Sequence, residues 1–180
     1  MNLYLRLIIL IIKTRFKPDL AFTEKSILKF YVLPNDLDFN MHMNNGRYNN
    51  IMDLGRIDLM LRSGAAELLR KKKWFGIVGS MQTKYRRPLK LLQAYELHTQ
   101  AVFWNEKWIW IEQEIYSKNK LISSSLVQTL IRGEGENISP SRLQQEMNLS
   151  LQPIKITNRI KLLESYLQYD EPCIVKQQNE

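Results

Sequence analysis

The sequence predicts an α+β domain in which a curved antiparallel sheet wraps around one long helix. Three observations lead to this fold class. The stretch 46–62 has apolar side chains at helical spacing on more than one side, which is typical of an enclosed helix. A short strand-like run, 26–33, precedes it and is rich in Ile, Phe, Tyr and Val. Four later stretches alternate apolar and polar residues between short turns, as neighbouring antiparallel strands do: 74–86, 94–104, 107–118 and 120–132.

The chain divides into three parts by composition. Residues 1–22 form an apolar and basic segment that we expect to be helical, and 23–135 form the sheet-and-helix domain. A turn-rich run at 133–137 ends that domain. The remainder, 136–180, is predicted to be a helical extension, with a short helix beginning near Pro140 and a longer amphipathic one over 156–169.

The N-terminal segment has two interpretations. Residues 2–12 are mostly aliphatic with Arg6 inside, and Lys13, Arg15 and Lys17 follow. The run is about half as long as a membrane-spanning helix requires, and the charges follow the apolar run, the reverse of a secretory signal. The helix therefore either packs on its own domain or on a partner subunit, or makes peripheral membrane contact through residues 2–15, with its basic flank meeting anionic lipid.

Composition excludes several classes of function. The chain has 180 residues and a hydrophobic fraction of 44%, enough for a packed core. Its one cysteine, Cys173, rules out an intrachain disulfide, and His42 and His98 are its only histidines. We therefore expect no metal, no cofactor and a cytoplasmic location, with peripheral attachment to the inner membrane surface as the alternative. The net charge of +8 indicates an anionic partner. Since acidic and basic residues are interleaved and no nucleic-acid-binding motif occurs, we expect no nucleic acid.

A dense polar cluster lies between the first strand and the long helix. It contains Asp36, Asp38, His42, Asn44 and Asn45. A turn and a helix cap would account for one Asn and one Asp. Polar groups packed between two apolar elements are costly to bury without partners, so the whole cluster is a candidate site.

The cluster also resembles a family signature. The run Asp-Leu-Asp-x-x-x-His-Met-Asn-Asn-x-x-Tyr, from Asp36 to Tyr48, is similar to that of hotdog-fold acyl-CoA thioesterases, the group that includes 4-hydroxybenzoyl-CoA thioesterase and thioesterase-like proteins. A second run, Tyr85-Arg86-Arg87-Pro88-Leu89, is similar to the family's segment before its long hairpin. The resemblance covers roughly 24–133. It implies a hotdog fold, hydrolysis of an acyl-CoA or acyl-carrier thioester, and a homodimer or higher homo-oligomer with the acyl site near the subunit interface.

The resemblance also implies roles for individual residues. Asp36 would be the catalytic carboxylate, which either activates water or attacks the thioester directly, and His42 is a second catalytic candidate. The N–H groups at the start of the helix would stabilise the thioester oxygen. Substrate-binding candidates are Asn44, Asn45, Gly46, Arg47, Tyr48, Arg86 and Arg87, the two arginines either meeting coenzyme A phosphates or lying on a solvated hairpin. We expect Asp36→Asn to remove turnover without unfolding, and Asp38→Asn to affect stability more than turnover.

Two points limit the enzyme prediction. Many relatives have Gly immediately before the motif histidine, where this chain has Met41, and Met restricts the loop's conformations. Some hotdog proteins bind acyl groups without hydrolysing them. The alternative function is therefore a non-catalytic acyl-CoA or acyl-carrier binding protein, possibly at a membrane.

Overall fold

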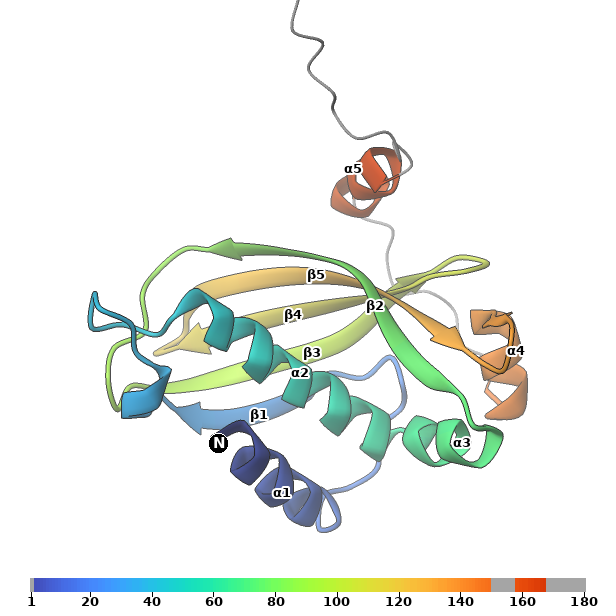
Figure 1. Cartoon of the computed structure of the whole chain (residues 1–180), viewed down its shortest axis with the longest axis horizontal. Coiled ribbons are helices and arrows are strands. Elements are labelled where there is room, and N and C mark those ends of the chain that lie inside the picture. Colours follow the sequence, from blue (N-terminus) through green and yellow to red (C-terminus); the bar gives the residue numbers. More distant parts are fainter. Residues whose placement is uncertain (1, 150–157, 168–180) are drawn as a thin grey trace, which may run out of the picture.

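The computed structural model describes residues 2–149 and 158–167 (Figure 1). The helices are α1 (Asn2–Thr14), η1 (Pro34–Asp36, a 3₁₀ turn), α2 (Asn45–Arg62), α3 (Ala65–Lys72), α4 (Pro140–Glu146) and α5 (Asn158–Leu167). The strands are β1 (Ser26–Tyr31), β2 (Phe75–Tyr85), β3 (Ala94–Trp104), β4 (Ile109–Ser117), β5 (Lys120–Arg132) and β6 (Asn137–Ile138).

The strands form one curved antiparallel sheet that wraps around α2 (Figure 1). The order is β1-β3-β4-β5-β2, with β6 pairing onto the end of β5. Strands β3, β4 and β5 follow one another through short turns, whereas the chain crosses along α2 between β1 and β2. Strands β1 and β2 therefore lie at opposite edges of the sheet. The predicted sheet around a helix is confirmed.

The core lies between α2 and the concave face of the sheet. The buried side chains of α2 include Tyr48, Ile51, Met52, Leu54 and Leu59. Leu61, expected to widen this apolar surface, is 37% exposed instead. It lies two positions beyond Leu59, about 200° around the helix, and so points away from the sheet.

Gly55 allows α2 to lie close against β3. A Cβ atom there would meet Thr99 Oγ1 at 2.3 Å and Leu97 Cδ2 at 2.7 Å, so no side chain fits without movement. The close approach also brings Gln113 of β4 to the helix, where its Nε2 donates to the carbonyl oxygen of Met52 at 2.7 Å. A buried polar contact thus fixes the helix on the sheet.

The other elements close the ends and the outer face of the domain. Leu143 of α4 packs with Leu69 of α3 and Ile138 at one end. Ile160 of α5 packs with Trp110 and other side chains on the opposite face of the sheet. The predicted helix over 156–169 is confirmed over the span of α5, and its first two and last two residues lie outside the described residues.

Helix α1 packs along α2 through one face. Leu3, Leu7 and Leu10 belong to the same apolar cluster as Leu54 and Met52 of α2. This confirms packing on its own domain, the first of the two interpretations. Within the described residues, no helix is long and apolar enough to cross a membrane.

A buried carboxylate holds the end of α1 in place. Asp58 of α2 is fully buried and accepts hydrogen bonds from Thr14 Oγ1 at 2.9 Å and Ser26 Oγ at 2.6 Å. Lys17 Nζ lies 3.3 Å and Arg62 Nη1 lies 3.5 Å from its oxygens. Asp58 therefore joins the end of α1 and the start of β1 to the C-terminal part of α2.

Candidate active site

The polar loop between β1 and α2 folds back on itself as a small hairpin. Leu37 and Met43 face each other in an antiparallel bridge. On either side of it, the Asp38 N–H donates to the His42 carbonyl at 2.9 Å and the Asn44 N–H to the Asp36 carbonyl at 2.8 Å. This folding brings both carboxylates and the imidazole to the N-terminal end of α2.

Met41 turns the tip of this hairpin in a strained conformation. Its φ angle is +60°, in the left-handed region that glycine adopts without penalty. The chain therefore keeps the backbone shape that a glycine would provide before His42, even though Met occupies the position. The side chain of Met41 is exposed, as is that of Phe39.

Asp36 is buried and occupied by structural partners. It is 1% exposed, and its Oδ2 accepts from the backbone N–H of Leu33 at 2.9 Å. The guanidinium of Arg6, which extends from α1, lies 2.6 Å from the same oxygen. Arg6 also donates to the carbonyl of Tyr31 at 3.2 Å. We expected the Asp36 side chain to make no contact that stabilises the fold. This expectation is wrong, because Arg6 of α1 covers the carboxylate and pairs with it. Its catalytic role stays a prediction.

Asp38 and His42 form a carboxylate–imidazole pair that is more exposed to solvent than Asp36. Their side chains are 24% and 37% exposed, and His42 Nδ1 lies 3.6 Å from Asp38 Oδ1. The same oxygen accepts from the Asn40 N–H at 2.9 Å. The expected hold of Asp38 on a neighbouring N–H is thus confirmed, and the side chain still faces solvent.

The start of α2 supplies polarised N–H groups to this region. Asn44 caps the helix, its Oδ1 accepting from the Gly46 N–H at 2.9 Å, as predicted. A Cβ atom at Gly46 would lie 3.1 Å from that oxygen, so glycine leaves room for the cap. Because the dipoles of an 18-residue helix add up at its N-terminus, this end favours negative charge.

Tyr48 lies beneath the site rather than in it. The side chain is buried, and burial raises the pKa of Tyr48 to about 12. Its ring meets that of Tyr85 edge-on, with centroids 5.2 Å apart. Tyr85 OH donates to the Asn45 carbonyl at 3.2 Å. The two rings thus connect the second motif to the first turn of α2.

Basic side chains surround this end of the helix. Arg86 and Arg87 are exposed directly after Tyr85, and Arg87 Nη1 donates to the carbonyl of Leu121 at 2.8 Å. Lys90, also exposed, forms an antiparallel bridge with His42. The second motif therefore lies beside the first, as the resemblance implied, and brings cations to it.

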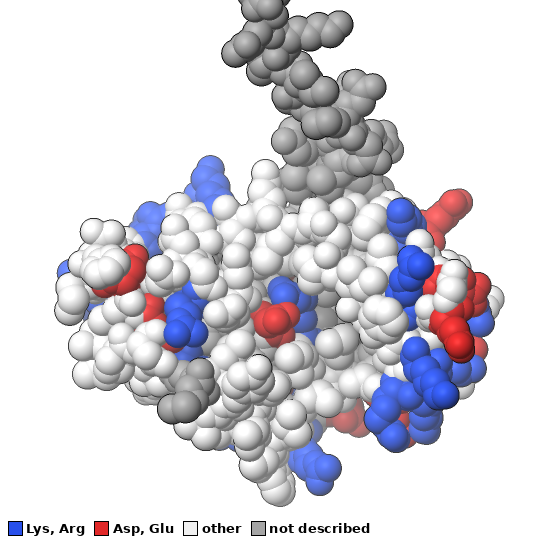
Figure 2. Space-filling view, viewed as in Figure 1, with Lys and Arg blue, Asp and Glu red and all other residues white. Residues whose placement is uncertain are grey.

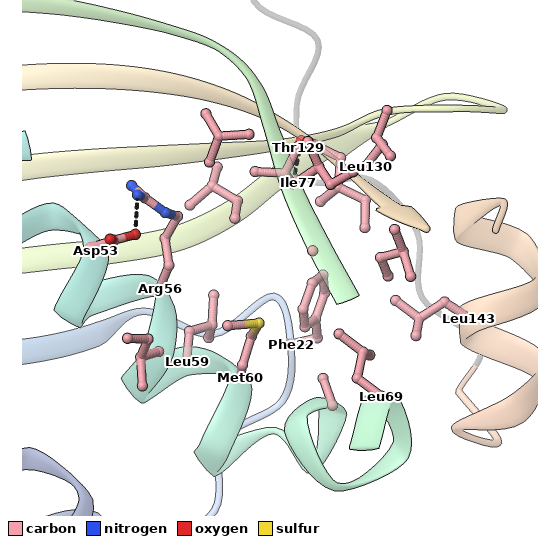
Figure 3. Close-up of a pocket in the computed structure, with 17 residues that line it drawn as sticks. Phe22, Asp53, Arg56, Leu59, Met60, Leu69, Ile77, Thr129, Leu130 and Leu143 are labelled. Carbon is pink, nitrogen blue, oxygen red and sulfur yellow. Dashed lines mark hydrogen bonds and ion pairs between the residues drawn. The ribbon is translucent and has the colours of Figure 1, made fainter. Parts of the chain in front are cut away.

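An apolar pocket of about 140 Å³ lies further along α2, between that helix, α3 and strands β2 and β5 (Figure 3). Figure 3 shows Asp53 and Arg56 at one end of the pocket. Arg56 Nη2 lies 2.5 Å from Asp53 Oδ1, the ion pair that their spacing of three residues on one helix favours. Leu69 and Leu143 lie at the other end. The walls are almost entirely aliphatic and aromatic, so the pocket suits an apolar group.

Sequence reasoning missed Arg6 and Asp58 as structural partners. The only signal for Arg6 was a single cation inside an apolar run, and the signal for Asp58 was an acid flanked by Ile57 and Leu59, four residues before Arg62. Among the described residues, no group of three or more His, Cys, Asp or Glu side chains is placed to hold a metal ion.

Comparisons with known proteins agree with the motif. Residues 32–140 match the model of the thioesterase-like superfamily. Protein THEM6 of Danio rerio is 38% identical over 110 residues, covering 59% of this chain and 54% of that protein. The probable thioesterase YBR096W of Saccharomyces cerevisiae is 28% identical over 116 residues, covering 63% of this chain and 50% of that one. The chain thus spans about half the length of these relatives.

A solved structure shares the fold. The gentisyl-coenzyme A thioesterase BH1999 superposes with a TM-score of 0.59 over 66% of this chain and 99% of its own, at 17% identity. This likeness confirms the hotdog fold that the motif implied.

Proposed function

The chain belongs to the thioesterase-like superfamily, and we propose that it hydrolyses acyl-coenzyme A thioesters with Asp38 as the catalytic carboxylate. The observation that supports this most directly is the accessible pair of Asp38 and His42, whose side chains lie 3.6 Å apart in the loop that leads into α2. Asp38 thus takes the role of catalytic carboxylate that the motif resemblance implied for Asp36, two residues earlier.

The choice between the two carboxylates rests on access. A general base must reach a water molecule and a nucleophile must reach the thioester carbon. Asp36 is 1% exposed and lies under the guanidinium of Arg6, whereas the side chain of Asp38 is 24% exposed. We therefore assign catalysis to Asp38 and give Asp36 the role of holding the loop against α1.

In the proposed reaction, Asp38 takes a proton from water as the water oxygen attacks the thioester carbonyl carbon. The carbonyl oxygen gains negative charge, which the N-terminal end of α2 favours. The carbon–sulfur bond then breaks, and the proton that Asp38 took from water passes by way of His42 to the departing thiolate, which restores both side chains. Direct attack by Asp38, through an acyl anhydride that water later cleaves, uses the same placement of groups.

The surroundings suit the two ends of an acyl-coenzyme A. The exposed cations Lys84, Arg86 and Lys90 lie on the segment beside the loop, where they would meet phosphates. Asp53 lies eight residues into α2 from Asn45, about 12 Å along the helix axis. The apolar pocket that begins there would receive the end of an acyl chain extended along α2.

The test is release of free thiol from a chain-length series of acyl-coenzyme A substrates. We expect Asp38→Asn to lower kcat roughly 10²–10⁴-fold while the protein stays folded, because general-base catalysis contributes about that much. Asp36→Asn, the matched control two residues away, should chiefly lower stability. If Asp36→Asn loses turnover while folded and Asp38→Asn keeps it, the assignment reverts to Asp36. Binding of acyl-coenzyme A without hydrolysis by the parent chain would instead establish the non-catalytic alternative.

We also propose that two copies pair through β2. This strand has 11 residues at the edge of the sheet, and Phe75, Val78 and Tyr85 on it are exposed. A long exposed edge strand is a liability in a monomer, and two-fold pairing removes it. Sedimentation equilibrium at micromolar concentration should give a dimer, and Val78→Lys should lower its fraction. A monomeric parent chain would refute the pairing.

A further inference from the structure

Helix α1 differs from an ordinary surface helix because its outer face is apolar as well as its inner one. Its inner face carries polar groups that are bonded to the domain: Arg6 to Asp36, and Thr14 to Asp58. Its outer face is apolar and exposed to solvent, through the side chains of Tyr4, Leu5, Ile8, Ile9, Ile11 and Ile12, with Phe16 just beyond the helix. Contiguous apolar surface of this kind marks an interaction site in a soluble protein.

The exposed face is fixed in place rather than loosely attached. The ion pair with Asp36 holds the first half of α1, and the hydrogen bond from Thr14 to buried Asp58 holds its end. Leu3, Leu7 and Leu10 add apolar contacts with α2 between these two points. Rotation that buried the outer side chains would break both polar contacts. The apolar face is therefore a stable property of the fold.

The exposed charges on residues 2–18 are all of one sign. This stretch has no acidic residue, and of its four cations Arg6 and Lys17 are paired with Asp36 and Asp58. The other two, Lys13 in the last turn of α1 and Arg15 directly after it, are exposed. Figure 2 shows little charge over α1 and basic side chains beside it. A cationic border on an apolar face matches anionic lipid.

A groove of about 510 Å³ continues this surface between α1 and β1. Its floor is apolar, with Leu10, Leu28 and Phe30, and Lys13 and Lys29 line it as well. An apolar trough with cations at its edge suits a lipid whose acyl part enters the groove and whose anionic head group stays outside.

We propose that the outer face of α1 docks on an anionic membrane surface, with the helix lying in the plane of the interface. At 13 residues the helix is about 20 Å long, too short to span a bilayer but long enough to lie in its head-group region. A second copy of this chain would bring the same cations and no acid to pair with them, whereas anionic lipid supplies the opposite charge. The proposal does not depend on the thioesterase assignment.

Flotation of the purified full chain with vesicles tests the proposal. We expect binding to phosphatidylcholine vesicles containing about one-third phosphatidylserine, and much weaker binding to phosphatidylcholine alone. Binding should fall as salt rises from about 0.1 M to about 1 M, because the screening length shrinks from about 10 Å to about 3 Å. The double variant Ile8→Asp/Ile12→Asp should lower vesicle affinity about tenfold or more, since two apolar side chains can no longer enter the interface.

Matched controls lie on α5, where Leu162 and Lys161 are exposed. Leu162→Asp should leave vesicle binding unchanged. Lys13→Glu/Arg15→Glu should weaken binding to anionic vesicles, and Lys161→Glu should not. Equal binding of parent and Ile8→Asp/Ile12→Asp chains, or no binding of the parent chain, overturns the proposal. If the parent chain does not bind vesicles and is an oligomer, whereas the Ile8→Asp/Ile12→Asp variant is a monomer, the outer face of α1 contacts a second copy of the chain instead. Normal thiol release by a chain that fails to bind vesicles would leave the proposed function intact.

Discussion

Replacing Arg6 with Met removes the guanidinium that covers Asp36 while keeping an unbranched apolar stem. The two charged atoms lie 2.6 Å apart, and the side chains of Arg6 and Asp36 are only 10% and 2% exposed, so water screens the pair little. Breaking a buried pair by removing one partner costs about 3–5 kcal/mol, because the other charge is left uncompensated. Since Asp36 keeps the Leu33 N–H, we expect the lower end, about 3 kcal/mol.

That loss should be visible as a change in thermal unfolding. A chain of 150–250 residues loses about 2–4 °C in Tm for each kcal/mol, so Arg6→Met should lower Tm by about 6–12 °C. Far-UV circular dichroism would follow the transition. Arg15→Met is the matched control, because Arg15 is exposed directly after the same helix and its loss should cost no more than about 0.5 kcal/mol.

A double-mutant cycle isolates the pair itself. The amide of Asp36→Asn can still accept from Leu33 but carries no charge for Arg6 to neutralise. In that background we expect Arg6→Met to cost at least about 1.5 kcal/mol less than it does in the parent chain. Additive effects to within about 0.5 kcal/mol, or a Tm of Arg6→Met close to that of the Arg15 control, would refute the bracing role of Asp36.

Three further outcomes follow from the packing of α2 and its loop. Gly55→Ala should destabilise the fold by about 1–3 kcal/mol in urea titrations, because the added Cβ would meet Thr99 Oγ1 at 2.3 Å. This cost should exceed the gain from alanine's better helix propensity. An unchanged urea midpoint would contradict that contact. Met41→Gly should raise stability by up to about 1 kcal/mol, since φ is +60° at that position, and a lower urea midpoint would count against strain there. Burial raises the pKa of Tyr48 from 10.0 to about 12, so the folded state holds that proton more tightly. Its contribution to stability is full below pH 10 and is lost as pH rises toward 12, and Tyr48→Phe should flatten that fall.

The fold followed from the sequence because its local patterns agree with its packing. Strands β3 and β5 begin and end where the alternation of residues predicted. The apolar stripe of α2 indicated enclosure because the sheet curves around it, and Gly55 marked the closest approach. Such features depend on neighbours that are near in sequence or on periodicity. The motif then added the hotdog family of folds, which periodicity alone does not determine.

The environment of the site could not be obtained in the same way. Asp36 and Asp38 are two residues apart in one turn-rich run, and nothing local distinguishes the buried one from the exposed one. The difference arises because Arg6, 30 residues earlier, reaches Asp36 from another helix. Likewise the ring of Tyr85 reaches the first turn of α2 from the second motif and meets that of Tyr48 edge-on. Both facts are contacts between segments far apart in the chain.

Helix α1 supplies a partner to each of two buried carboxylates, Asp36 and Asp58. Arg6 holds the loop that carries Asp38 and His42, and Thr14 holds the buried end of α2 through Asp58. Displacing α1 would leave two buried carboxylates, Asp36 and Asp58, without some of their partners. Because an unpaired buried charge is destabilising, both the loop of the candidate site and helix α2 would lose stability. A membrane that binds the outer face of α1 need not move the helix to affect the site. It would favour the conformation in which Arg6 and Asp36 are paired, and so stabilise the loop that carries Asp38 and His42.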